Sequence, residues 1–254
     1  MISDKALELN ISLVLEVRGD SVECTGIQAI KPGGGLAGNG IDPNRAMTRI
    51  GKETSGTNGV LPLYVSHADV SGKGLPAAMV ATGVHSVVDG SIGQGKSLAE
   101  MAEDLNHFLI NSMDRQSHLT VLAVRFDPRS GQMEYLNAGH PPIMVSNRRG
   151  DVRELNFGHN PPLGVLPTSP TIDTDALGAG ELLFLYTDGL TEMYDADGKM
   201  LGIAGVKMRI GELYSTNAGL PLAQLRDKLS DQLDEIRGES PATDDRTFLL
   251  ARRL

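Results

Sequence analysis

Acidic residues at three sites in this sequence share one local pattern, and that pattern is suited to binding a hard metal ion. Asp69 follows the apolar run LPLYVSHA, Asp188 follows LLFLYT, and Asp244 and Asp245 precede RTFLLA. Each acid lies at one end of a predicted strand and beside a turn. If these strands are neighbours, their ends converge and the carboxylates cluster.

Clustered carboxylates repel one another, and a cation between them offsets the cost of ionising them. Mg²⁺ and Mn²⁺ prefer carboxylate oxygens, carbonyl oxygens and water, whereas few histidines or cysteines stand at the spacing of a zinc site. Two such ions lower the pKa of a bound water and hold a phosphoryl group, as in two-metal hydrolysis. The spacing alone leaves a second interpretation open, because an aspartate at a strand end commonly forms part of a turn.

The elements around these acids occur as hairpins and as groups of helices. Short turns between apolar runs predict antiparallel neighbours, and strands and helices that do not alternate favour an α+β fold with segregated layers. Without a linker or a break in composition, residues 1–254 are expected to form a single domain. Strands are predicted over 11–17, 23–30, 60–69, 118–126, 132–139, 141–146, 152–157, 181–186 and 246–254, helices over 77–88, 98–109 and 222–236, and a long loop over 31–59.

Composition excludes several classes of protein. A formal charge of -9 and a pI of about 5.1 argue against non-specific binding to nucleic acid, which needs a basic surface. The single cysteine cannot form an intrachain disulfide, and no apolar stretch is long enough to span a membrane. With no secretion signal at the N-terminus, we expect a cytoplasmic protein without membrane or nucleic-acid partners.

Motifs of other hydrolases and nucleotide-binding proteins are not matched. The segment SGKG has Gly74 where a phosphate-binding P-loop requires Ser or Thr, and DADGK lacks the distal glutamate of a calcium-binding loop. No G-x-S-x-G turn is present for a serine hydrolase. The acidic strand ends therefore remain the main candidates for chemistry.

Five segments in order, ADVSGKGLPAAM, LNAGHPPIMV, PPLGVLP, LLFLYTDGLTEMYDADGKMLG and DDRTFLLARR, resemble the PPM family of metal-dependent serine/threonine phosphatases. Within that family they are most similar to the bacterial SpoIIE/RsbU-like branch, from about residue 60 to the C-terminus. The resemblance implies a four-layer αββα sandwich of two antiparallel β-sheets flanked by helices. It also implies that Asp69 bridges two Mn²⁺ or Mg²⁺ ions, that the Val70 carbonyl ligates one of them, and that Asp188 and Asp244 are further ligands, with Asp69 and Asp188 essential for catalysis.

The sequence departs from the family pattern at two places. The branch has a G-G-D-x-x-D motif, and its best counterpart here is AGNGID, which puts Asn39 at the first acid and Asp42 at the second. Asn39 offers a neutral oxygen, so metal affinity should fall and Asp42 becomes the substitute ligand. Ser71 occupies the position where eukaryotic members have a proposed general-acid histidine, so water on the metal takes that role. Ser71 and Lys73 are candidates for contacting the substrate phosphate, although a lysine beside a glycine turn is commonly a surface residue.

The resemblance implies hydrolysis of phosphoserine or phosphothreonine on a bacterial signalling protein, with a STAS-type anti-sigma-factor antagonist as a possible substrate. Attack by a metal-bridging hydroxide would need no phospho-enzyme. Regulation is expected from a partner in trans or from homodimerisation. Asn39 motivates an alternative, a weakly active or inactive phosphatase-fold module that binds a regulatory partner. A metal hydrolase acting on phosphate-free esters is a third interpretation.

Overall fold

The computed structural model describes most of the chain, with side chains from residue 79 onward. Within the described ranges the chain forms two β-sheets, two pairs of long helices and one short helix. The ranges are residues 10–18, 21–30, 46–52, 63–70, 75–112, 118–127, 130–155, 160–167, 169–238 and 246–254.

The first sheet contains six of the described strands in the order β2–β1–β11–β10–β7–β8. Its neighbours are antiparallel except for β1 and β11, which run parallel with Asn10 opposite Arg246. The strands nearest the C-terminus therefore lie at the centre of this sheet. Its strands are β1 (Asn10–Arg18), β2 (Ser21–Ile30), β7 (Ile143–Ser146), β8 (Val152–Leu155), β10 (Leu182–Tyr186) and β11 (Arg246–Arg253).

The second sheet contains five of the described strands in the order β3–β4–β5–β6–β9, and all its neighbours are antiparallel. β4 lies between β3 and β5, so its backbone is paired on both sides from Leu63 to Asp69. The strands are β3 (Ala46–Lys52), β4 (Leu63–Val70), β5 (Leu119–Phe126), β6 (Gln132–Ala138) and β9 (Asp173–Ala176).

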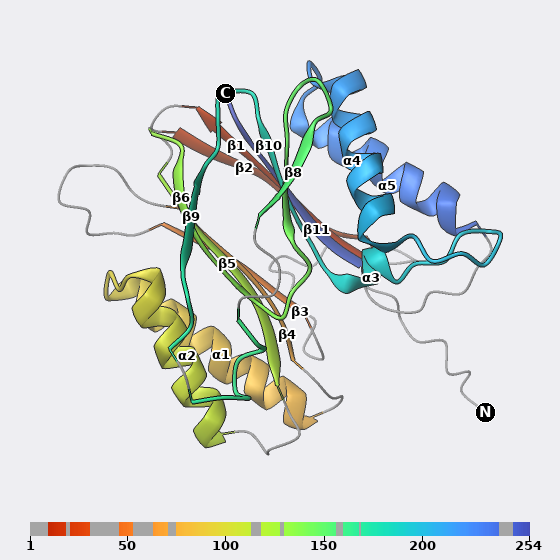
Figure 1. The fold of residues 1–254 in the computed structure, drawn as a ribbon. Coiled ribbons are helices and arrows are strands. Elements are labelled where there is room, and N and C mark those ends of the chain that lie inside the picture. The colour runs from red at the N-terminus through yellow and green to blue at the C-terminus, as the bar shows by residue number, and fades with distance from the viewer. Residues whose placement is uncertain are drawn as a thin grey trace.

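Three apolar clusters hold the layers together. One joins α1 (Leu75–Gly93) and α2 (Leu98–Ser112) to the second sheet, one fills the space between the sheets, and one joins the first sheet to α4 (Gly202–Asn217) and α5 (Leu222–Arg237). The helix pairs cover the two outer faces (Figure 1), which confirms the predicted four-layer αββα sandwich. No helix in the ranges above is long and apolar enough to cross a membrane.

The elements with strong local signals form as predicted. The backbone N–H of Ser97 donates to Glu100 Oε2 at 2.8 Å, and the N–H of Glu100 donates to Ser97 Oγ at 3.3 Å, so the capping box begins α2. The hydrogen bond from the Ser97 N–H lowers the pKa of the Glu100 carboxyl. In α5 the predicted stripe Leu222, Leu225, Leu229 and Leu233 is buried against the first sheet.

Other elements were not predicted from the sequence. α4 has three glycines, Gly202, Gly205 and Gly211, that weaken its helical signal, and β3 lies inside the segment expected to be a loop. β9 has the sequence DTDA, which lacks apolar alternation because it is an edge strand. The parallel pairing of β1 with β11 is a further difference from an all-antiparallel arrangement.

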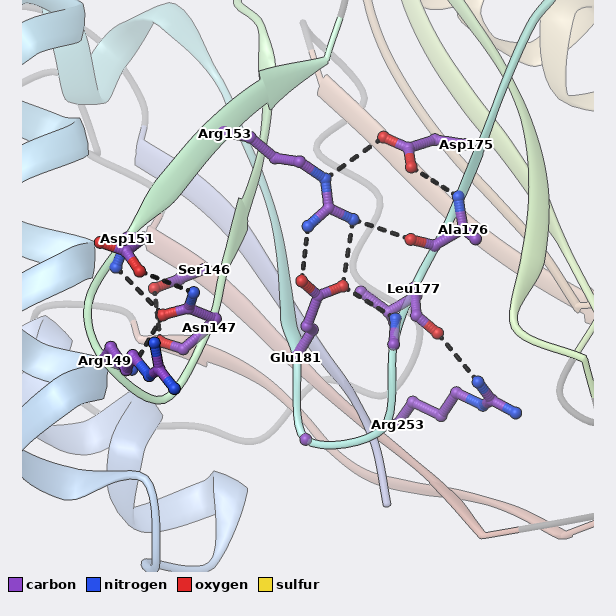
Figure 2. Close-up of polar contacts among 12 residues, drawn as sticks. Ser146, Asn147, Arg149, Asp151, Arg153, Asp175, Ala176, Leu177, Glu181 and Arg253 are labelled. Atoms are coloured by element: carbon purple, nitrogen blue, oxygen red, sulfur yellow. Dashed lines mark hydrogen bonds and ion pairs between the residues drawn. The ribbon is translucent and has the colours of Figure 1, made fainter.

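An arginine on β8 links the edges of the two sheets (Figure 2). Arg153 Nη1 and Nη2 donate to the two carboxylate oxygens of Glu181 at 2.5 and 3.0 Å, and Arg153 Nε contacts Asp175 Oδ2 on β9 at 3.4 Å. Nη2 also donates to the Ala176 carbonyl at 2.7 Å. Because β8 is at the edge of the first sheet and β9 is at the edge of the second, this network joins the two layers where neither sheet has another described strand.

The carboxylate of Glu181 should give this link a pH dependence. Burial raises the pKa of this carboxyl, whereas the hydrogen bonds from Arg153 and from the Gly178 N–H lower it. The lowering effects together are larger, so the pKa lies below the ordinary value of 4.5. The contribution to stability is therefore present above pH 4.5 and is lost as the pH falls through the folded-state pKa.

We expect Glu181→Gln to lower the free energy of unfolding by about 1 kcal/mol at neutral pH, since the pair is partly exposed. The difference from wild type should shrink as the pH falls below 4.5 and through the folded-state pKa of Glu181, because the wild-type carboxyl then also becomes neutral. Urea unfolding at several pH values measures both. A difference that stays constant over this range would show that the charge of Glu181 is not responsible.

Candidate active site

The site begins at the adjoining ends of β10 and β11. These strands pair antiparallel with Tyr186 opposite Phe248, and two more hydrogen bonds extend the pairing beyond them. The Thr187 N–H donates to the Thr247 carbonyl at 3.0 Å, and the Thr247 N–H donates to Thr187 Oγ1 at 3.0 Å. Both threonines are buried. We call these two threonines and their hydrogen bonds the β10–β11 seam.

Asp188 follows the seam directly and begins the short helix α3 (Asp188–Thr191). Its backbone carbonyl accepts hydrogen bonds from the Glu192 N–H at 2.8 Å and from the Thr191 hydroxyl at 2.9 Å. The other residues of α3 are buried, whereas Asp188 is only half-buried. The backbone is therefore fixed on both sides of Asp188, while the residue itself stays partly exposed.

The seam also determines which part of the chain lies beside Asp188. β11 begins at Arg246, immediately after Asp245 and two residues after Asp244. The end of β10 and the start of β11 thus meet. Asp244 itself lies outside the described residues, as do Asn39, Asp42, Ser71 and Lys73.

Asp69 and Val70 end β4 in the second sheet. The backbone of Asp69 pairs with Ala46 on β3 and Thr120 on β5, and Val70 pairs with Leu119. In Figure 1, β4 and β10 both run toward the lower right of the view, so both strands end on the same side of the sandwich. The end of β4 in the second sheet and the end of β10 in the first sheet therefore point the same way. This is the arrangement that the predicted cluster of Asp69 and Asp188 needs.

Of the predicted metal ligands, Asp188 is the one with a described side chain. Among the described side chains, no group of three or more His, Cys, Asp or Glu residues is arranged to hold a metal ion. The donor set that the sequence proposes is oxygen-rich, and a half-buried carboxylate at a fixed backbone position is compatible with a hard divalent ion. The complete ligand set remains a prediction.

Sequence analysis missed the residues that hold these strand ends. Thr187 and Thr247 form the seam, and Arg246 is a buried charged residue at the first position of β11. The available signal was a charged residue at the start of the otherwise apolar run RTFLLA. Local patterns do not reveal whether such a residue points to solvent or packs beneath a helix.

This architecture is that of the PP2C-type phosphatases. The SiaA-PP2C domain of Pseudomonas aeruginosa superposes with a TM-score of 0.68 at 19% identity, covering 84% of this chain and 82% of that domain. RsbX in complex with magnesium superposes with a TM-score of 0.56 at 15% identity, covering 84% of this chain and 88% of RsbX.

The family model described as Stage II sporulation protein E (SpoIIE) matches residues 62–254, and the chain belongs to the SpoIIE family. The phosphoserine phosphatase RsbP of Bacillus subtilis (strain 168) is 24% identical over 188 residues. That alignment covers 72% of this chain and 43% of RsbP, so the chain spans less than half the length of this relative.

Proposed function

We propose that this protein is a Mn²⁺- or Mg²⁺-dependent phosphatase that hydrolyses phosphoserine or phosphothreonine on a signalling protein. The observation that carries the proposal is the β10–β11 seam, because it joins the strand that ends before Asp188 to the strand that begins after Asp244. Membership of the SpoIIE family and similarity to a protein named phosphoserine phosphatase support the same reaction.

In this proposal, some residues at the site bind the metal ions and others contact the substrate. Asp69, Asp188 and Asp244 hold two metal ions, with the carbonyl of Val70 as a further ligand, and Asp42 and Asn39 complete the oxygen set. When bound by these residues, Mn²⁺ or Mg²⁺ would lower the pKa of a water that could then act as the nucleophile, and would offset negative charge on the phosphoryl group. Lys73 and Ser71 contact the substrate phosphate and hold it in line for attack.

The substrate in this proposal is a phosphorylated signalling protein of the kind represented by STAS-type regulators. A regulatory partner or a second copy of the chain controls activity.

The direct test is hydrolysis of p-nitrophenyl phosphate and of a phosphoserine peptide with Mn²⁺, with and without chelator. We expect metal-dependent release of inorganic phosphate, suppressed by chelator and restored by added Mn²⁺, without a phosphorylated protein intermediate. Turnover that is indifferent to chelator contradicts the proposal. Turnover of phosphate-free esters instead of phosphate esters indicates the other class of metal hydrolase.

Asn39 provides a prediction that separates an active enzyme from a binding module. We expect Asn39→Asp to tighten Mn²⁺ binding by roughly tenfold, because a carboxylate adds a negative charge to the ligand set. Isothermal titration calorimetry measures the affinity, and Asn44→Asp is the control that adds the same charge nearby.

Equal affinity in wild type, Asn39→Asp and Asn44→Asp would exclude Asn39 from the ligand set. Phosphatase activity that appears only in Asn39→Asp would favour the alternative function, a phosphatase-fold module that binds a regulatory partner.

A further inference from the structure

Arg246 is a buried arginine at the first position of β11. Its side chain is 7% exposed, and Nη2 lies 2.7 Å from Asp234 Oδ1 on α5. Nη1 lies 3.7 Å from the sulfur of Met193, on the segment that follows α3. The guanidinium of Arg246 therefore contacts both α5 and the segment that leads away from Asp188. Arg246 is also the first residue of β11, the strand that follows Asp244.

The side chain of Arg246 belongs to the face of β11 that packs on the helices. Alternate residues of a strand face opposite sides, and Phe248 and Leu250 lie in the apolar cluster with α4 and α5, whereas Leu249 and Ala251 lie between the sheets. Arg246 faces the same side of β11 as Phe248 and Leu250, since it precedes them by two and four residues, and it contacts α5. The contact with Asp234 thus fixes the start of β11 against the helical layer.

A second buried arginine lies on the same face at the other end of the strand. Arg252 Nη1 donates to the carbonyls of Ala218 and Leu220 between α4 and α5, at 3.1 and 2.9 Å. Arg246 and Arg252 are 6% and 5% exposed, so the free-energy cost of removing each from water is nearly the same. They differ in position, because Arg246 adjoins the acidic strand ends and Arg252 lies six residues further along β11.

The contacts of Arg246 converge with the β10–β11 seam. Arg246 immediately precedes Thr247, whose N–H is held by Thr187 Oγ1, and Thr187 immediately precedes Asp188. Met193 follows α3 after one intervening residue. A shift of Arg246 would therefore move the start of β11 and the exit from α3 together, and with them the position of Asp188 relative to the start of β11.

We infer that Arg246 is a positioning residue for the metal centre. Through Asp234 and Met193 it fixes the distance between the strand end that carries Asp188 and the strand start that follows Asp244. The inference rests on the proposed function, because it takes Asp188 and Asp244 to be ligands of the same metal pair.

The test compares Mn²⁺ binding to the full-length, metal-free protein in wild type, Arg246→Met, Arg246→Lys and Arg252→Met. Methionine keeps an unbranched apolar stem but loses the fork of donors, and Asp234, which is 56% exposed, remains hydrated when its partner is removed. We expect Arg246→Met to weaken Mn²⁺ binding by roughly 10- to 100-fold, the range typical of residues that orient metal ligands. Arg246→Lys should recover part of that loss.

Two further measurements separate positioning from a general loss of stability. Arg252→Met should lower the thermal midpoint at least as much as Arg246→Met while leaving the Mn²⁺ dissociation constant unchanged. In the metal-free protein, amide hydrogen exchange at Thr187 and Thr247 should accelerate in Arg246→Met and not in Arg252→Met. Phosphatase activity of Arg246→Met should recover as Mn²⁺ is raised to saturation.

The outcomes distinguish the two proposals. If wild type binds no Mn²⁺, the proposed function fails and the positioning role fails with it. If wild type binds Mn²⁺ but Arg246→Met binds it equally well, or if Arg252→Met weakens binding to the same degree, the proposed function survives and the positioning role is overturned. If Arg246→Met does not fold, the comparison of Arg246→Lys with wild type decides by the same criteria.

Discussion

Replacing Asp188 by Asn is expected to lower metal-dependent phosphatase activity by about a thousandfold, equivalent to roughly 4 kcal/mol of transition-state stabilisation. The change keeps the size of the side chain but removes a negative charge from the proposed metal site. Because the Asp188 backbone is held by the seam and by α3, the protein should remain folded. Steady-state kinetics over a range of Mn²⁺ concentrations, with circular dichroism as a check on folding, measures the effect.

Asp197→Asn is the matched control. Asp197 is exposed in the turn after α3 and is nine residues from Asp188, so the same loss of charge there should leave kcat and the Mn²⁺ dependence at wild-type values. An Asp188→Asn protein with nearly wild-type activity at low Mn²⁺ would remove Asp188 from the metal site, and with it the central support for the proposed mechanism.

Gly211→Ala is expected to lower the free energy of unfolding by about 3 kcal/mol, the upper part of the range for overpacking. A Cβ at this position would lie 2.6 Å from the Gly150 carbonyl oxygen and 3.1 Å from Val152 Cγ2. Gly150 has φ +88° and belongs to the turn between β7 and β8, so the turn and α4 meet backbone to backbone. Neither backbone can rotate away as a side chain would.

Equilibrium unfolding in urea measures this effect, with Gly219→Ala as the control. A Cβ at Gly219, between α4 and α5, would meet no atom within 4 Å, and that variant should be as stable as wild type or slightly more stable. Equal stability of the two variants would show that α4 is not held at this distance from the β7–β8 turn. Gly83→Ala is a less informative comparison, because its new Cβ meets the ring of Phe108, which can turn.

The parts of the fold that could be predicted are those specified by neighbouring residues. Ser97 and Glu100 identify the start of α2, and the leucines of α5 identify its buried face. The order of hairpins and helix pairs was enough, with the family resemblance, to give the four layers. β3 and α4 were missed because their local signals are weak and their stability comes from tertiary contacts, such as that between Gly211 and Gly150.

The sequence nominates the acids of the candidate site, whose role as ligands stays a prediction, but it does not reveal the framework around them. Apolar runs beside turns identify Asp69 and Asp188 in the sequence, whereas the register that sets Thr187 beside Thr247 depends on pairing across sixty residues. The burial of Arg246 likewise depends on α5, since Asp234 is its partner. No spacing within a short window encodes contacts of this kind.

The parallel pairing of β1 with β11 has a consequence for how the chain folds during synthesis. β11 lies between β1 and β10, and Asn10 reaches its partner Arg246 across more than two hundred residues. Until β11 leaves the ribosome, β1 and β10 each have one edge that lacks its native partner. Such unpaired edges can form hydrogen bonds with strands of other chains. The nascent protein should therefore depend on chaperones until β11 emerges, and removal of β11 should give aggregates rather than a smaller folded protein.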